Sequence, residues 1–197
     1  MSQTKVLADR IYQGEGLAAD VVRIVAANIL LALCAHIAIP LPWTLVPITG
    51  QTFGVLFVAV LLGSRRGAIA IVLYLLEGMA GLPVFQPYGL PGPARFFGPT
   101  AGYLLAYPPA AFLAGWLMEN ARIKGAVRLA SALFCGEVLI FLSGCAWLAT
   151  AMGLGWSSAL QQGALPFLPG EIIKMTVMVG AARGLELAGE KVQGPTP

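Results

Sequence analysis

Glu171 and Lys174 place a carboxylate and an ammonium three residues apart, at the start of a long apolar segment. Pro169 suits the first turn of a helix, where its missing N–H costs nothing, so a helix is predicted over about 169–187. On that helix Glu171 lies beside the positive end of the helix dipole, and the i, i+3 spacing puts Lys174 on the same face. The helix is nearly long enough to span a bilayer core. Ionisable groups inside a membrane are costly and usually face a cavity or a partner, so this pair is a candidate binding site.

Each candidate charge in the membrane or its outer loops has a second interpretation that the sequence leaves open. The Glu171–Lys174 pair could simply neutralise itself and fix helix packing. Glu77 is interpreted equally well as a site residue or as a group at the membrane surface. Arg95 could meet an anionic substrate or be a solvated loop charge. Glu137 is interpreted as a packing or coupling group rather than as a substrate ligand.

The composition is that of a polytopic membrane protein. The 197 residues are 58% hydrophobic and only 11% charged, with a mean hydropathy of +0.81. The apolar runs are continuous rather than alternating, which favours helices over a transmembrane β-barrel. The formal net charge of +3 does not indicate nucleic-acid binding, because the cations are spread over short loops. The three cysteines lack the spacing of metal ligands, so we expect free thiols and neither a metal site nor a cofactor.

The pattern predicts one all-α membrane domain over residues 21–190, with about six transmembrane helices. A polar segment, 1–20, precedes it, and a polar tail, 191–197, follows it; both are predicted to be cytoplasmic. The predicted spans are about 21–39, 52–62, 68–82, 100–118, 129–152 and 169–187. Small residues recur at four-residue spacing on the fourth span and predict close helix packing there, at Gly102, Ala106, Ala110 and Ala114.

The cations set the orientation of the predicted bundle. With both termini in the cytoplasm, ten of the 12 Lys and Arg residues fall on the cytoplasmic side, Arg95 alone falls outside, and Lys174 lies in the membrane. This threading puts the Pro-rich loops 40–50 and 83–99 outside, and Glu77 and the Glu171–Lys174 pair in the outer half of the membrane. We therefore expect an outward-facing pocket in a multi-pass protein of a bacterial cell (inner) membrane. The two outer loops are candidate lids.

Motifs of catalysis are missing from the sequence. There is no Gly-x-x-x-x-Gly-Lys-Ser/Thr phosphate loop and no Gly-x-Gly-x-x-Gly. Ser143 lacks the preceding glycine of a nucleophile elbow, and nothing places the lone His36 beside it. We interpret Ser143 as a packing residue and His36 as a boundary histidine, and we expect that the chain is not an enzyme.

Six blocks occur in order between about residues 39 and 174: Ile39-Pro40-Leu41-Pro42, Val46-Pro47-Ile48-Thr49-Gly50-Gln51-Thr52, Leu61-Leu62-Gly63-Ser64-Arg65-Arg66-Gly67-Ala68, Gly81-Leu82-Pro83-Val84-Phe85, Gly98-Pro99-Thr100-Ala101-Gly102-Tyr103 and Pro166-Phe167-Leu168-Pro169-Gly170-Glu171-Ile172-Ile173-Lys174. Together they resemble the BioY family, the biotin-specific S components of energy-coupling-factor (ECF) transporters. The family usually has Asp where this chain has Glu171. The glutamate keeps the carboxylate and lengthens its reach by one methylene.

The resemblance implies a six-helix membrane subunit that captures extracellular biotin and delivers it inward. Its implied partners are an ECF transmembrane coupling subunit and ATP-binding subunits, which supply the energy. A carboxylate such as Glu171 can accept hydrogen bonds from the ureido head, and Lys174 can pair with the valerate. Gln51 can add an amide contact, and Phe85 and Trp43 can cover the apolar ring. The alternative function is an ion-coupled secondary carrier for a small anionic metabolite, although no inverted repeat is evident.

Overall fold

The computed structural model describes residues 16–120 and 125–193, and for residues 181–193 it describes the course of the backbone only. The predicted segments 1–20 and 191–197 therefore lie mostly outside the described residues. The described chain is nearly all helical, so the all-α class is confirmed. Its elements are, in order, α2 (Leu17–His36), β1 (Ala38–Ile39), β2 (Ile48–Thr49), α3 (Gln51–Met79), the 3-10 helix η1 (Gly92–Phe97), α4 (Ala101–Asn120), α5 (Gly125–Thr150), α6 (Gly155–Gly163) and α7 (Leu168–Gln193).

Helices occupy all six regions that the sequence predicts as spans. Among the described residues, three helices are long and apolar enough to cross a membrane: α2, α3 and α5. The structure differs from the prediction at the second and third spans, which belong to the single 29-residue α3. Two short helices, η1 and α6, were not predicted, and η1 lies within the loop 83–99.

The break within α3 is a single residue, Gly63, rather than the predicted loop 63–67. Gly63 has φ 79° and ψ −176°, a conformation that glycine adopts without steric cost. The helical segment that follows exposes unpaired N–H groups at its start. The carboxylate of Glu119 on α4 accepts hydrogen bonds from Ser64 N at 2.8 Å and from Ser64 Oγ at 2.7 Å. A side chain of the neighbouring helix therefore caps this helix start.

Close packing around α4 holds the bundle together, as the small residues of its sequence predict. Ala106, Ala110 and Ala114 are buried, and a side chain at Gly102 would overlap Trp147 of α5. Such small residues let helix backbones approach closely. The largest fully buried side chains come from α2, α3 and α5 and form the centre of the core: Leu31, Val55, Leu56, Val58, Ile71, Tyr74, Leu133, Ile140 and Leu148.

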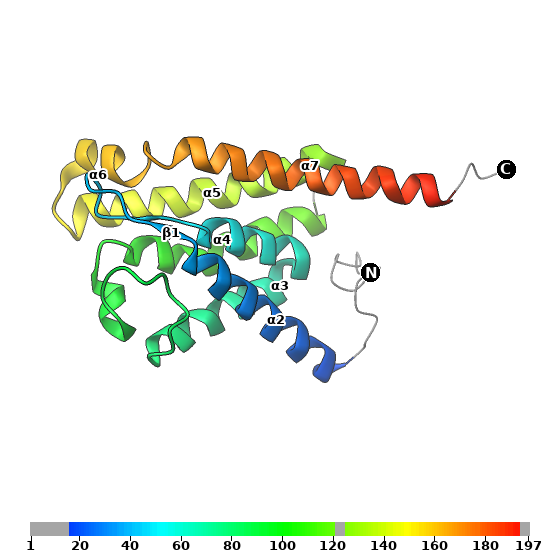
Figure 1. Cartoon of the computed structure of the whole chain (residues 1–197), viewed down its shortest axis with the longest axis horizontal. Coiled ribbons are helices and arrows are strands. Elements are labelled where there is room, and N and C mark those ends of the chain that lie inside the picture. Colours follow the sequence, from blue (N-terminus) through cyan, green and yellow to red (C-terminus); the bar gives the residue numbers. More distant parts are fainter. Residues whose placement is uncertain (1–15, 121–124, 194–197) are drawn as a thin grey trace.

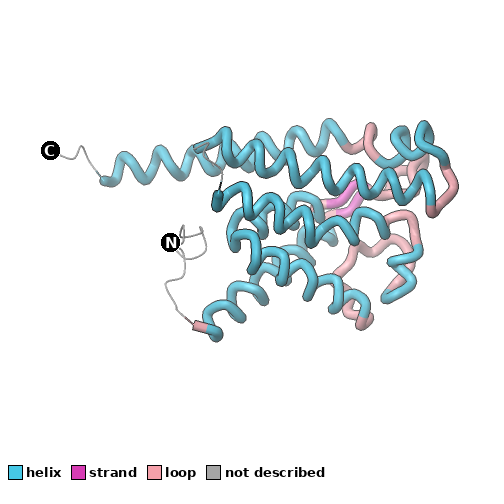
Figure 2. The backbone as a smooth tube through the Cα atoms, turned by 180° about the vertical axis from the view of Figure 1, so that it is seen from behind, coloured by secondary structure: helices cyan, strands magenta, loops and turns pink. Residues whose placement is uncertain are grey.

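The two ends of the bundle differ in structure. The start of α2 and the end of α7 lie at one end (Figure 1). At that end Asp20 of α2 forms ion pairs with Arg23 at 2.9 Å and with Arg66 of α3 at 3.0 Å. The hairpin of β1 and β2, the loop 80–100 and α6 gather at the opposite end, where most of the described irregular backbone lies (Figure 2). We call this second end the loop end.

The described exterior of the helices is apolar. Large hydrophobic side chains are exposed along one stripe of α2, at Val21, Val25, Ile29 and Leu33, and on α7, at Ile172, Ile173 and Val177. In water such surfaces would be unusual for a monomeric protein, whereas a bilayer solvates them. The exterior therefore agrees with the membrane class that composition indicates.

Candidate functional site

The predicted pair on α7 is formed in the structure. Lys174 Nζ lies 2.7 Å from Glu171 Oε1, and the Glu171 side chain is only 6% exposed. Thr52 at the start of α3 donates a hydrogen bond to the second carboxylate oxygen of Glu171 at 3.0 Å. The carboxylate is thus held by groups from two helices that are far apart in the sequence. We call Glu171, Lys174, Thr52 and Thr49 the ion-pair cluster.

All three N–H groups of the Lys174 ammonium have partners within the chain. They bind Glu171 Oε1, the backbone oxygen of Thr49 at 2.8 Å, and Thr52 Oγ1 at 3.3 Å. An ammonium has three donors and no acceptor, so none remains for a further group. The contacts tie α7 to β2 and to the first turn of α3, which places the pair beside the hairpin of the loop end.

A second set of polar contacts links the start of α3 to the loop 80–100. Gln51 Nε2 donates to Tyr74 Oη at 2.8 Å, and Tyr74 Oη donates to the backbone oxygen of Val84 at 2.9 Å. The ring of Phe85 meets that of Tyr74 edge-on, with centroids 5.3 Å apart. Thr49 Oγ1 donates to Gln51 Oε1 at 3.5 Å, which joins this set to the ion-pair cluster.

Arg95 is buried within the loop 80–100 rather than solvated. Its guanidinium donates to the backbone oxygens of Tyr88 and, at 2.9 Å, of Gln86, and it lies 5.6 Å from the centre of the Phe85 ring. Among the described residues no carboxylate pairs with Arg95, and its buried Nε has no hydrogen-bond partner. Burial lowers the pKa of this guanidinium, with Tyr74 opposing the shift, but an arginine starts so far above neutrality that it stays charged.

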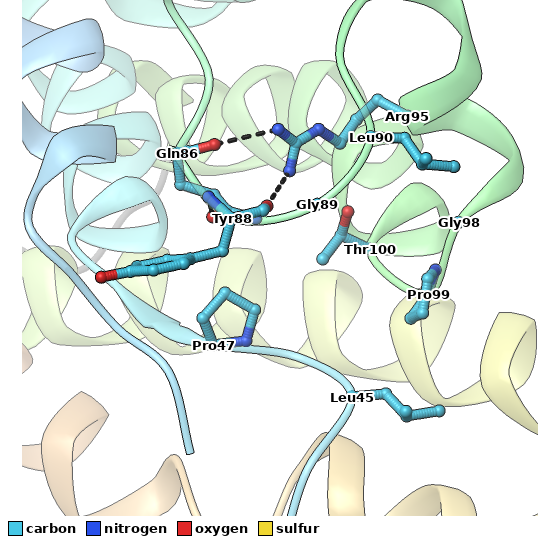
Figure 3. Close-up of a pocket in the computed structure, with 10 residues that line it drawn as sticks. All are labelled: Leu45, Pro47, Gln86, Tyr88, Gly89, Leu90, Arg95, Gly98, Pro99 and Thr100. Carbon is cyan, nitrogen blue, oxygen red and sulfur yellow. Dashed lines mark hydrogen bonds between the residues drawn. The ribbon is translucent and has the colours of Figure 1, made fainter. Parts of the chain in front are cut away.

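A small pocket lies between the segment that joins the two strands and the loop 80–100 (Figure 3). Arg95 is the single charged residue of the pocket wall. Its hydrogen bonds to the backbone oxygens of Gln86 and Tyr88, drawn as dashed lines in Figure 3, hold the guanidinium beside the pocket. The cavity measures about 140 Å³, less than the roughly 300–1,000 Å³ usual for a ligand site, so it holds only part of a small molecule. It is lined by Leu45, Pro47, Gln86, Tyr88, Gly89, Leu90, Arg95, Gly98, Pro99 and Thr100.

Five of the seven predicted site residues are joined by contacts, and two are not. Glu171 and Lys174 belong to the ion-pair cluster, whereas Gln51, Phe85 and Arg95 are linked through Tyr74. Glu77 lies near the end of α3 and makes no side-chain hydrogen bond or ion pair with the described residues. Trp43 lies in the segment that joins the two strands, and 66% of its surface is exposed.

Sequence reasoning did not single out Thr49, Thr52 and Tyr74 as functional residues. Thr49 and Thr52 stand within one of the family-like blocks, and that was the only available signal for them. No sequence signal marked Tyr74, because an aromatic residue in an apolar run is usually a core residue. Glu137 was interpreted as a packing or coupling group, yet its buried carboxyl interacts with both Glu171 and Lys174.

Other candidate chemistries lack the necessary groups among the described residues. No three His, Cys, Asp or Glu side chains of that part of the chain come together as metal ligands. Ser143 donates its hydroxyl hydrogen to the backbone oxygen of Gly102 at 2.8 Å, the packing role predicted for it. His36 contacts the backbone oxygen of Ala32 at 2.8 Å within its own helix.

Comparison with known proteins identifies similar chains. The model of the BioY family matches residues 3–191. A "Biotin transporter BioY" of Rhizobium etli is 40% identical over 158 residues, which cover 77% of this chain and 83% of that protein. A "Probable biotin transporter BioY" of Pyrococcus horikoshii is 35% identical over 77% of this chain and 83% of its own length.

One solved structure is also similar in fold. The crystal structure of the S-component for biotin from an ECF-type ABC transporter superposes with a TM-score of 0.74 at 25% sequence identity. The match covers 88% of this chain and 95% of that one.

Proposed function

The chain belongs to the BioY family, and we propose that it is the membrane subunit that captures biotin outside the cell for uptake. The observation that carries the proposal is the loop end, where the ion-pair cluster and the Arg95 pocket offer groups for both polar ends of biotin. The ureido head has two N–H donors, and the valerate is an anion. The family match and the named relatives support the same substrate.

The proposed topology has six crossings, with both termini in the cytoplasm of a bacterial cell. The break at Gly63 divides α3 into the segments 51–62 and 64–79, and the bond between Gln51 and Tyr74 is consistent with an antiparallel pair. The first segment is shorter than a full span, so its crossing would include residues of the loop before it. The start of α2 and the end of α7 lie at the same end of the bundle (Figure 1), where Arg23 and Arg66 also lie. Cations in short loops mark the cytoplasmic side, which makes the loop end the outer end.

Within the outer end, the ion-pair cluster is the proposed subsite for the ureido head. Because Glu171 and Lys174 are 2.7 Å apart, they form one subsite and cannot contact opposite ends of an extended ligand. The donors of Lys174 are also occupied, so the lysine serves mainly to neutralise and orient the carboxylate. The ureido head then donates to Glu171 in a charge-assisted hydrogen bond.

Arg95 is the proposed partner of the valerate, instead of the Lys174 that the sequence suggested. Its charge faces the pocket between the outer loops, and no carboxylate of the described residues neutralises it. Phe85 lies between this arginine and Tyr74 and would contact the apolar part of the ligand. The loops 40–50 and 83–99, with Trp43, would close over the site when the ligand is bound.

The energy for inward delivery would come from partners rather than from this chain. The solved relative is the S component of an ECF-type ABC transporter, so we expect an ECF transmembrane coupling subunit and ATP-binding subunits. The chain itself would be a binding subunit and not an enzyme. The apolar exterior of the helices would contact the lipid bilayer.

The second candidate function is an ion-coupled carrier for a small anionic metabolite. The observation that favours it is the meeting of two carboxyl groups, Glu137 and Glu171, in the bundle interior. Two such groups could exchange a proton during transport. Uptake into vesicles separates the two functions: collapse of the proton gradient should stop a carrier and leave ATP-driven uptake running.

Calorimetric titration of the purified protein with biotin tests the proposed function. We expect a saturable one-to-one complex, and weaker binding of a biotin analogue whose ureido ring has been opened. A protein that is folded by circular dichroism and shows no heat of binding would contradict the proposal.

A further inference from the structure

Glu137 is a buried acidic residue without a structural explanation. It lies near the middle of α5, and its side chain is 6% exposed. Its Oε1 atom is buried and has no hydrogen-bond partner among the described residues. Burying a carboxyl oxygen without a partner is costly, and such atoms in folded proteins usually have an explanation.

The groups that face Glu137 come from two other helices. Its carboxyl interacts with the carboxyl of Glu171 and with the ammonium of Lys174, both on α7. Tyr107 of α4 is also buried and lies within electrostatic range of both carboxyl groups. Because Glu137 interacts with two members of the ion-pair cluster, it extends the polar interior from α7 toward α5.

The ammonium of the cluster has no donor left for this free oxygen. The three N–H groups of Lys174 are taken by Glu171, Thr49 and Thr52, so none points to Glu137. One ammonium also faces two carboxyl groups, which disfavours the entry of a third anionic group. What fits the free oxygen is a neutral N–H donor, brought in by a ligand.

A cyclic urea carries two such donors on one rigid ring. Given the proposed biotin-binding function, on which this inference rests, we propose that Glu137 is a substrate-binding residue. It accepts one ureido N–H of biotin through Oε1, while Glu171 accepts the other. The arrangement selects neutral rings with two N–H groups and turns the valerate away from the cluster, toward Arg95.

The test measures binding of three ligands to the wild type and to Glu137→Leu. The ligands are biotin and two cyclic carbamates, in each of which one ureido N–H is replaced by oxygen. Loss of the hydrogen bond to this buried oxygen should weaken biotin binding to Glu137→Leu by about tenfold. One carbamate already lacks the N–H that faces Glu137, so it should lose less than about threefold on the same substitution. The other carbamate should lose as much as biotin does.

Glu137→Gln keeps the size of the side chain and serves if Glu137→Leu does not fold. A glutamine can turn its NH₂ group toward a ring oxygen, whereas the free Oε1 of Glu137 can only accept a hydrogen bond. The preference between the two carbamates should therefore shift by at least about tenfold relative to the wild type. Glu119→Gln, which removes a carboxylate at the opposite end of the bundle, is the matched control and should leave all three affinities unchanged.

Three results would overturn the inference. They are biotin binding to Glu137→Leu within about twofold of the wild type, an equal loss for all three ligands, and an unchanged carbamate preference in Glu137→Gln. In each case the wild type binds biotin, so the proposed function stands and only the role of Glu137 fails. A wild type that does not bind biotin would instead refute the proposed function itself.

Discussion

Two cations are held at the loop end of the bundle, and their environments are opposite. Lys174 lies on a helix, and the carboxylate of Glu171 neutralises it at 2.7 Å. Arg95 lies in a loop segment, is held by backbone oxygens, and has no carboxylate partner among the described residues. A neutralised charge needs nothing from a ligand, whereas a buried charge without a counter-ion favours an anion. The comparison therefore supports the proposal that Arg95 binds the anionic tail of biotin and that the ion-pair cluster binds the neutral head.

The largest effect on stability is expected from Lys174→Met. The substitution leaves Glu171 buried without its cation, and breaking a buried pair by removing one partner costs about 3–5 kcal/mol. Because the Lys174 side chain is 21% exposed, we expect a value toward the lower end. Denaturant unfolding of the ligand-free protein in micelles would measure the change in the free energy of unfolding. Glu171→Gln in the same background should restore part of the loss, and a loss below 1 kcal/mol would contradict the role of Lys174 as the neutralising partner.

Arg95→Met should lower ligand affinity more than it lowers stability. Removing the guanidinium deletes a charge-assisted bond to the valerate, so biotin binding should weaken by roughly ten- to hundredfold. The backbone oxygens of Gln86 and Tyr88 lose their donor, but no carboxylate is left without a counter-ion. Arg95→Met should therefore lower the free energy of unfolding of the ligand-free protein by less than Lys174→Met does. Equal losses of stability in the two variants would remove the distinction between the two cations.

A smaller effect is expected from Tyr74→Phe, which acts on the link between the two sites. The Tyr74 hydroxyl binds Gln51 at 2.8 Å and Val84 at 2.9 Å, and a neutral hydrogen bond contributes about 1 kcal/mol. Affinity should fall by about three- to tenfold, equally for biotin and for biotin amide, because neither ligand end is touched directly. Calorimetry with both ligands checks this. A selective loss for one of them would show that Tyr74 belongs to a single subsite.

The smallest effects are expected at the two predicted residues that lie outside the contact network. Glu77 has no polar partner among the described residues, and the side chain of Trp43 is 66% exposed. Glu77→Gln and Trp43→Ala should each change biotin affinity by less than about threefold. A larger loss for Trp43→Ala, together with slower hydrogen exchange in the loop 40–50 when biotin is added, would contradict this and show that loop closure brings Trp43 onto the ligand.

The parts that the sequence predicted well are those set by local spacing. The i, i+3 geometry of Glu171 and Lys174, the small-residue stripe of α4 and the helical regions all follow from neighbours along the chain. The partners of Lys174 at Thr49 and Thr52 could not be predicted, because more than a hundred residues separate them from it. The burial of Arg95 depends on how a glycine- and proline-rich loop folds, and no periodic pattern describes such a loop. The non-helical backbone conformation of one residue, Gly63, takes the place of the predicted loop 63–67.

The most direct test of the assignment compares biotin with biotin amide in the wild type, Arg95→Met and Lys174→Met. Amidation removes the charge of the tail and should weaken wild-type binding by roughly ten- to hundredfold. In Arg95→Met the amide should bind nearly as well as biotin, because the partner of the carboxylate is already gone. In Lys174→Met the full penalty for amidation should remain. If the penalty instead disappears in Lys174→Met and persists in Arg95→Met, the valerate pairs with Lys174, and the assignment of the two cations is wrong.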